Sequence, residues 1–196
     1  MAVAFDVLRA YLQERAAFTD AEFAFIEKLF VPAELEAHAI FQRAGEVARY
    51  SAFVARGCLR KYVIDGQGKE HIVQFAPENW WVADANSLAN GTPSQYFIDA
   101  LEDSEMLLID APSHDTLVEN VPGYAAAFRR GLQRHAAARD ERIANSLSAS
   151  AEERYTQFLH TYPSIATRVP QRMLASYLGV SPETISRIRG RLARKP

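Results

Sequence analysis

Residues 170–192, PQRMLASYLGVSPETISRIRGRL, restrict the fold of this chain more than any other stretch. Gly179 stands where a first helix must end, because glycine accepts the positive φ found at many helix C-termini. Ser181 is a good N-cap, and Pro182 suits the first position of a second helix, where its missing N–H costs nothing. Apolar residues recur every three or four positions on both sides of this turn, namely Met173, Leu174, Tyr177 and Leu178 before it and Ile185, Ile188 and Leu192 after it. The stretch therefore predicts two short helices packed at an angle, with Val180 filling the turn.

The second of these helices carries a polar face. Glu183 and Arg187 are four residues apart, so they share one side of the helix near its N-terminus. Glutamate accepts a hydrogen bond from cytosine N4, and arginine pairs with O6 and N7 of guanine in the major groove. Because helix-turn-helix proteins present the start of the second helix to the bases, we predict Glu183, Ser186 and Arg187 as base contacts. The residues predicted to contact phosphates, which position a protein without reading sequence, are Arg172, Ser181, Thr184, Arg189, Arg191 and Arg194.

The alternative is a helical hairpin that only packs, in which Glu183 and Arg187 form a surface ion pair worth about 0.3–0.5 kcal/mol. The distribution of charge favours DNA binding. The whole chain has a net charge of −2. Residues 168–196 hold seven basic residues and one acidic residue, a net charge of +6, which leaves fifteen basic and twenty-three acidic residues, a net charge of −8, for the rest. A basic end on an acidic body is typical of a DNA-binding module joined to another module.

The composition excludes several classes of protein. With 196 residues, 48% hydrophobic and 23% charged, the chain can form one large or two modest globular domains. No window reaches the unbroken apolar length of a membrane span, and the first residues lack the pattern of a secretory signal, so we expect a cytoplasmic protein without membrane contact. The lone Cys58 excludes an intrachain disulfide and a cysteine-ligated metal cluster built within one chain.

Before the C-terminal helices, the spacing of apolar residues changes from helical to strand-like and, further along the chain, back to helical. Residues 5–30 have helical spacing, and Thr19 with Glu22 predicts a capping box at the start of the second helical segment. A period of two then predicts strands over 35–41, 50–55, 58–64, 69–75, 96–100 and 105–110, separated by turn signals. Gly66 and Gly68 form the clearest hairpin signal. Short strands of this kind indicate an antiparallel sandwich or barrel.

Residues 123–147 are predicted to form one long helix. Phe128, Leu132, Ala136, Arg139 and Ile143 follow one side at a spacing near a heptad, which allows pairing with a second copy of the helix. Burial of this stripe against the chain's own strands is the competing interpretation. A further helix is predicted from Ser150, with Glu153 completing a capping box, and residues 165–169 are predicted to form a short strand.

The positions of Ala175, Gly179, Ile185 and Ile188 match the helix-turn-helix consensus, and SPETISRI resembles the recognition helix of the Crp/Fnr family of bacterial transcription regulators. The order of parts also resembles that family along nearly the full chain. The resemblance implies an α+β fold: an antiparallel β-roll (jelly roll) of the cyclic-nucleotide-binding kind with flanking helices in residues 1–121, a dimerisation helix in 122–147 and a helix-turn-helix domain in 148–196. It implies a homodimer that reads a two-fold-symmetric operator on double-stranded DNA, with RNA polymerase and an unidentified small effector as further partners. Few residues follow Leu192, so we expect a truncated wing, which must come from residues 163–170.

The resemblance also locates an effector pocket. Cyclic-nucleotide-binding relatives hold the ribose with a Gly-Glu and the phosphate with an arginine and a helix N-terminus. Pro77-Glu78 and Thr92-Pro93-Ser94 stand at those places here, and the arginine is missing, so we do not expect cyclic AMP to bind. The remaining candidates for a pocket that takes an uncharged, cationic or aromatic ligand are Glu78, Trp80, Trp81, Asp84, Ser87, Ser94 and Tyr96. Packing is the alternative role of the two tryptophans. An iron–sulfur cluster, which relatives that sense oxygen use, is not expected with one cysteine.

Enzymatic function finds little support in the sequence. The five histidines, at positions 38, 71, 114, 135 and 160, are not in a spacing typical of metal ligands. No serine lies in a nucleophile elbow, and no glycine-rich phosphate loop occurs. We therefore predict a DNA-binding regulator rather than an enzyme. The alternative from another class is a ligand-binding β-barrel whose basic tail docks on a protein.

Overall fold

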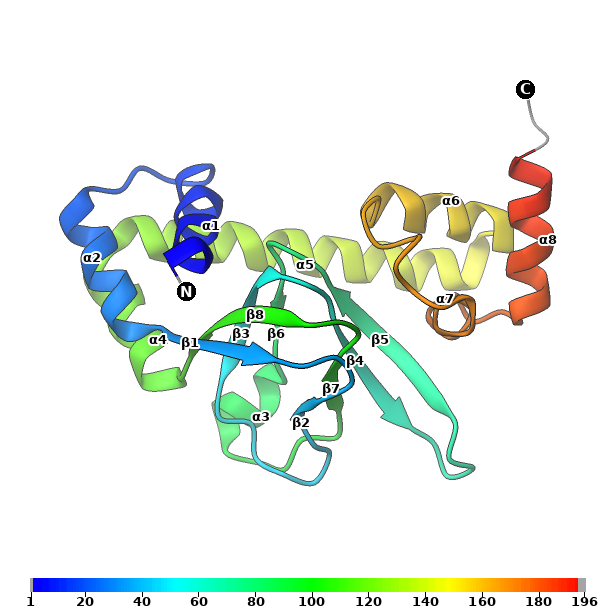
Figure 1. The fold of residues 1–196 in the computed structure, drawn as a ribbon, viewed down its shortest axis with the longest axis horizontal. Helices are drawn as coiled ribbons and strands as arrows, with labels where there is room; N and C mark the ends of the chain where they lie inside the picture. The colour runs from blue at the N-terminus through cyan, green and yellow to red at the C-terminus, as the bar shows by residue number, and fades with distance from the viewer. Residues whose placement is uncertain (1, 194–196) are drawn as a thin grey trace.

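The computed structural model describes residues 2–193 of the chain (Figure 1). The helices are α1 (Ala2–Gln13), α2 (Asp20–Leu29), α3 (Ala85–Asn90), α4 (Ala111–Asn120), α5 (Pro122–Ser148), α6 (Ala151–Thr161), α7 (Gln171–Leu178) and α8 (Pro182–Leu192). The strands are β1 (Val31–Leu35), β2 (Ile40–Gln42), β3 (Ser51–Arg56), β4 (Leu59–Ile64), β5 (Glu70–Ala76), β6 (Trp81–Val82), β7 (Phe97–Ala100) and β8 (Ser104–Ile109). In Figure 1, α5 extends along the length of the molecule, with α1, α2 and α4 at one end and α6, α7 and α8 at the other.

The strands form a β-roll of two antiparallel sheets, with strand orders β1-β8-β3-β6 and β2-β7-β4-β5. Apolar side chains from both sheets form one buried cluster, which comprises Ala52, Val54, Leu59, Ala76, Val82, Ile98 and Met106. The α+β fold with an antiparallel roll, predicted from the sequence, is confirmed. One strand prediction is wrong: residues 36–39 form a turn between β1 and β2, in which His38 has a φ of +68°.

Sequence signals that span only a few residues predicted a hairpin turn and two helix starts correctly. The hairpin between β4 and β5 closes with Gly68 at a φ of +80°. The carboxylate of Asp65 accepts hydrogen bonds from the backbone N–H groups of Gln67 and Lys69 and lies 2.7 Å from the ring of His71. The hydrogen bond from His71, followed by those from the two amides, lowers the pKa of Asp65 to about 2. Both predicted capping boxes, Thr19 with Glu22 and Ser150 with Glu153, are present.

Helix α5 has two different faces. The side turned toward the rest of the chain consists of Tyr124, Ala127, Gly131, His135, Ala138, Arg142 and Asn145, all buried or half-buried. The stripe predicted for dimerisation lies beside it: Phe128 is half-buried against Trp81 and His114, whereas the leucine and the isoleucine face outward. Leu132 and Ile143 on this stripe are 53% and 54% exposed, and Leu147 one turn further is 84% exposed. Burial against the chain's own β-roll, the competing interpretation, therefore holds for Phe128 and does not hold for Leu132 and Ile143.

Helices α6, α7 and α8 pack on one another and on the β-roll. Their apolar side chains share a cluster with the outer side of the second sheet, where Tyr62, Ile72 and Phe75 meet Tyr155 and Phe158. Residues 163–168 form turns, so the predicted strand over 165–169 is wrong. Buried Ile165 instead accepts a turn hydrogen bond, 3.0 Å long, from the N–H of Val169. Residues 163–170 therefore supply no strand for a wing. Within residues 2–193, no helix combines the length and apolar character that crossing a membrane requires.

Candidate nucleic-acid interface

The turn between α7 and α8 has the geometry that the sequence predicts. Gly179 has a φ of +67° and a ψ of +38°, the left-handed conformation that ends a helix abruptly. The N–H of Val180 donates to the carbonyl of Ala175, at 3.0 Å. Ser181 caps α8, where its hydroxyl accepts a 3.3 Å hydrogen bond from the N–H of Thr184, and Pro182 is the first helical residue.

The undersides of both helices are buried, which fixes their relative orientation. Leu174, Ile185 and Ile188 are completely buried, and Ala175 is 1% exposed. Each of these side chains belongs to the apolar cluster that α6, α7 and α8 share with the β-roll. Because the apolar stripe of α8 faces inward, the polar residues on the opposite side of the helix face solvent.

The three predicted base-contact residues, Glu183, Ser186 and Arg187, are all exposed. Arg187 donates a hydrogen bond from Nη2 to the hydroxyl of Thr184, 3.2 Å away. Hydrogen bonds from the backbone of Glu183 itself and from Ser181, together with the nearby charge of Arg187, lower the pKa of the Glu183 carboxyl. Among the ion pairs of residues 2–193, none joins Glu183 to Arg187 within 4 Å. The alternative of a helical hairpin that only packs assumed an ion pair between these two side chains, so the geometry does not support that alternative.

The residues predicted to contact phosphates fall into different environments. Arg172, Ser181 and Arg191 are exposed, and Thr184 is half-buried. Arg191 lies 3.3 Å from Glu152. Arg189 donates from Nε to the hydroxyl of Tyr155, 2.9 Å away, and from Nη2 to the carbonyl of Ala166, 3.0 Å away. These two bonds anchor α8 to α6 and to the turn before α7, so Arg189 faces the protein in this structure. Arg194 lies outside the described residues.

These contacts reduce the positive charge available to DNA. Arg168 forms ion pairs with Glu78 and Glu102 of the β-roll. Of the arginines from 168 to 193 that the structure describes, Arg172 and Arg187 form no ion pair within 4 Å, and the one hydrogen bond from Arg187 goes to the hydroxyl of Thr184. The +6 charge of the C-terminal stretch therefore overstates its electrostatic attraction for phosphates.

The predicted effector residues separate into three groups. Asp84 caps α3 by accepting hydrogen bonds from the N–H groups of Asn86 and Ser87, and Ser94 donates to the same carboxylate over 2.8 Å. Ser87 also donates to the carbonyl of Thr92. Asp84, Ser87 and Ser94 are thus brought together, and each has its partners within the protein. Tyr96 lies nearby, with the ammonium of Lys61 3.9 Å from the centre of its ring.

The tryptophans and Glu78 lie elsewhere. Trp80 stacks on His135 of α5, with ring centroids 5.1 Å apart, and Trp81 packs between Phe30 and Phe53. These contacts support the packing role for both tryptophans. Glu78, which the resemblance places against a ribose, precedes β6 and accepts hydrogen bonds from the N–H of Gly57 and from Arg168. Asp84, rather than Glu78, lies at the N-terminus of α3.

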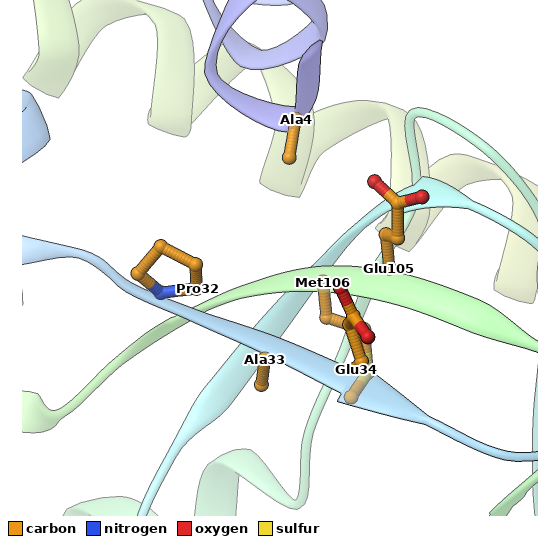
Figure 2. Close-up of a pocket in the computed structure, with 6 residues that line it drawn as sticks. All are labelled: Ala4, Pro32, Ala33, Glu34, Glu105 and Met106. Atoms are coloured by element: carbon orange, nitrogen blue, oxygen red, sulfur yellow. The ribbon is translucent and has the colours of Figure 1, made fainter. Parts of the chain in front are cut away.

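Two surface hollows occur near the β-roll. The first, about 250 Å³, lies between α1 and strands β1 and β8, where Figure 2 shows its lining residues Ala4, Pro32, Ala33, Glu34, Glu105 and Met106. The second, about 350 Å³, lies where the β-roll meets the C-terminal helices and is lined by Arg56, Gly57, Glu78, Glu102, Asp103 and Arg168. Glu78 is the only predicted effector residue that lines either of these two hollows.

Fold and surface define a two-module protein: a β-roll joined through a long helix to a helix-turn-helix. Residues 32–120 match the model of the cyclic nucleotide-binding domain. The chain is 27% identical over 107 residues to the transcriptional regulatory protein btr of Bordetella pertussis, a match that covers 49% of this chain and 44% of that protein. It therefore spans less than half the length of this curated relative.

Solved structures share most of this fold. FixK2 from Bradyrhizobium japonicum matches with a TM-score of 0.66 and 20% identity over 84% of each chain. The catabolite activator protein of Thermus thermophilus matches with a TM-score of 0.56 and 20% identity over 90% of this chain and 84% of that one. The structural matches establish the fold, and the domain match and the related regulator show that the chain is similar to transcription regulators that carry a cyclic nucleotide-binding domain.

Proposed function

We propose that this chain is a cytoplasmic, homodimeric transcription regulator that binds a two-fold-symmetric operator on double-stranded DNA, with RNA polymerase as a further partner. The three functional parts are the β-roll of residues 1–121, the dimerisation helix of 122–147 and the DNA-binding module of 148–196. The observation that carries the proposal is the exposed trio Glu183, Ser186 and Arg187 on a helix whose opposite side is completely buried. A carboxylate and a guanidinium at the start of α8 have the chemistry to read cytosine and guanine.

The exposed leucine and isoleucine side chains of α5 support the proposed dimer. A single recognition helix discriminates weakly, and two-fold pairing places two such helices on half-sites one helical turn apart. Leu132, Ile143 and Leu147 are exposed apolar side chains on one side of this long helix. Pairing with the same stripe of a second copy would bury them.

The proposal is tested by selecting double-stranded DNA from a random pool with the full-length protein. We expect enrichment of one palindromic sequence, with an affinity at least about a thousandfold above that for random competitor and falling steeply with salt. Weak binding that is equal for all sequences would contradict the proposal and favour a ligand-binding barrel with a protein-docking tail.

Arg187→Ala is expected to cost about 1–3 kcal/mol of operator binding and to relax specificity at one base position in each half-site. The reason is the loss of a bidentate donor to a single guanine. The matched control is Arg172→Ala, which removes another exposed arginine and should weaken all sequences alike while lowering the salt slope by about one. Equal effects of both variants on every sequence, measured by titration of single-base operator variants, would exclude base reading by Arg187.

We also propose that the β-roll does not bind cyclic AMP. The carboxylate of Asp84 already accepts the hydrogen bonds at the start of α3, so an anionic phosphate there would meet a negative charge. Cyclic AMP at concentrations up to millimolar is therefore expected to leave the melting temperature of the protein unchanged. Because a ligand at 100 times its Kd stabilises a folded protein by about 2.7 kcal/mol, a rise of several degrees would show that this expectation is wrong.

A further inference from the structure

Helix α7 of the DNA-binding module lies along the free edge of the β-roll. Strand β5 is the last strand of its sheet, so one side of its backbone has no partner strand. The hydroxyl of Ser176 fills part of this edge, because it accepts from the N–H of Ile72, 3.1 Å away, and donates to the carbonyl of Glu70, 2.9 Å away. Figure 1 shows α7 beside β5, with α5 passing the same place.

Arg142 of α5 completes this edge. Its guanidinium donates hydrogen bonds to the carbonyls of Ile72 and Val73 on β5 and to the carbonyl of Tyr177 near the end of α7. The bonds to Ile72 and Tyr177 are 3.0 and 2.9 Å long. The same group lies 3.9 Å from the centre of the Tyr177 ring. One side chain thus joins the long helix, the β-roll and the first helix of the DNA-binding module.

A second arginine, Arg168, anchors the module at the segment that precedes α7. Arg168 lies two residues before Pro170 and forms ion pairs with Glu78, at 2.8 Å, and with Glu102. All three side chains are partly buried, between 28% and 37% exposed. Residues 149–150 link α5 to α6. Two anchors at separate points, together with the shared apolar cluster, prevent the DNA-binding module from rotating about this linker.

We propose that Arg142 is a positioning residue: it fixes the DNA-binding module relative to α5 and thereby sets the half-site spacing that a dimer accepts. The argument about spacing rests on the proposed function, whereas the anchoring itself does not. Residue 142 is next to Ile143 of the outward stripe, so the contact that orients each module begins one residue from the proposed dimer contact. The spacing of two α8 helices then depends on α5 rather than on the flexibility of the linker.

The anchoring is tested by amide hydrogen exchange, followed by NMR, in the full-length protein. The N–H of Ile72 is held by Ser176 of α7, so it exchanges when the module leaves the β5 edge. We expect Arg142→Gln to accelerate exchange at Ile72 at least tenfold and Arg142→Lys to have a smaller effect. The N–H of Ala100, which donates to Ala39 inside the β-roll, should not change and serves as the internal reference for folding.

The matched control is Arg134→Gln, the same change at an exposed arginine of the same helix, which should leave exchange at Ile72 unchanged. An Arg142→Gln protein in which Ala100 stays protected and Ile72 exchanges as in the wild type would overturn the anchoring, whatever the protein does with DNA.

The consequence for DNA is measured with operators whose half-sites are moved apart in steps of one base pair. The wild type should prefer one spacing at least tenfold, and Arg142→Gln should reduce that preference below threefold while binding a single half-site as well as before. Arg187→Ala should behave in the opposite way, with weaker half-site binding and an unchanged spacing preference. A wild-type protein that selects no DNA would refute the proposed function alone. Accelerated exchange at Ile72 with an unchanged spacing profile would overturn the positioning role.

Discussion

Ile143→Glu is expected to convert the proposed dimer into a monomer and to lower operator affinity at least about 100-fold. Ile143 is 54% exposed in the single chain, so glutamate should not disturb the fold of the monomer. In the proposed dimer, two such carboxylates would face each other in an apolar contact, where burying an unpaired charge is costly. The loss of affinity follows because binding through two linked sites exceeds binding through one by about 10² to 10⁴.

The measurements are the molar mass by light scattering and the titration of a palindromic operator. Ala144→Glu is the matched control, since it places the same side chain at the next, equally exposed position on another side of α5. That variant should remain dimeric and bind the operator normally. A dimeric Ile143→Glu protein would show that the outward stripe of α5 is not the contact between protomers.

Arg60→Met is expected to reduce the free energy of unfolding by about 3–5 kcal/mol, the usual cost of leaving one partner of a buried ion pair alone. Arg60 and Asp99 are each 7% exposed, and Nε and Nη2 of Arg60 lie 2.7 and 2.9 Å from the two carboxylate oxygens. Glu70 provides a second carboxylate, 2.5 Å from Nη1. Methionine keeps the apolar stem and removes the charge, so Asp99 would remain buried without a cation.

Denaturant unfolding at one fixed protein concentration measures this loss. Arg56→Met is the control, because Arg56 is paired with Glu105 but is itself 67% exposed, and a surface pair contributes at most about 1 kcal/mol. Replacing Asp99 by asparagine in the Arg60→Met protein should restore part of the stability, since no uncompensated charge would then be buried. Equal losses of unfolding free energy for Arg56→Met and Arg60→Met would show that burying the ion pair does not increase its contribution to stability.

Much of the fold was predictable because its signals act over a few residues. The capping boxes at Thr19 and Ser150, the turn at Gly179 and the hairpin at Gly68 each depend on groups within one helical turn or one hairpin loop. The errors arose where such signals were weak. Strand β6 has two residues and α3 has six, too few to show a period, and the turn over 36–39 interrupts what looked like one continuous strand.

The candidate site was predictable to a similar degree. The exposure of Glu183 and Arg187 follows from the apolar spacing of Ile185 and Ile188 on the same helix. The environment of Arg189 did not follow, because its partners, Tyr155 and Ala166, belong to other segments. For the same reason, the sequence placed Glu78 among the effector residues, whereas its partners in the structure are Gly57 and Arg168.

By itself, the sequence determined where helices begin and end, which side of α8 faces solvent, and the likeness to a family of regulators. Those properties depend on residues a turn apart, and local spacing records them. The tertiary structure alone decided that Arg142 and Arg168 hold helices α6, α7 and α8 to the β-roll and that Leu132, Ile143 and Leu147 of α5 lie exposed. The contacts of Arg142 with Val73 and of Arg168 with Glu78 span 69 and 90 residues, and no local pattern specifies which distant groups the folded chain brings together.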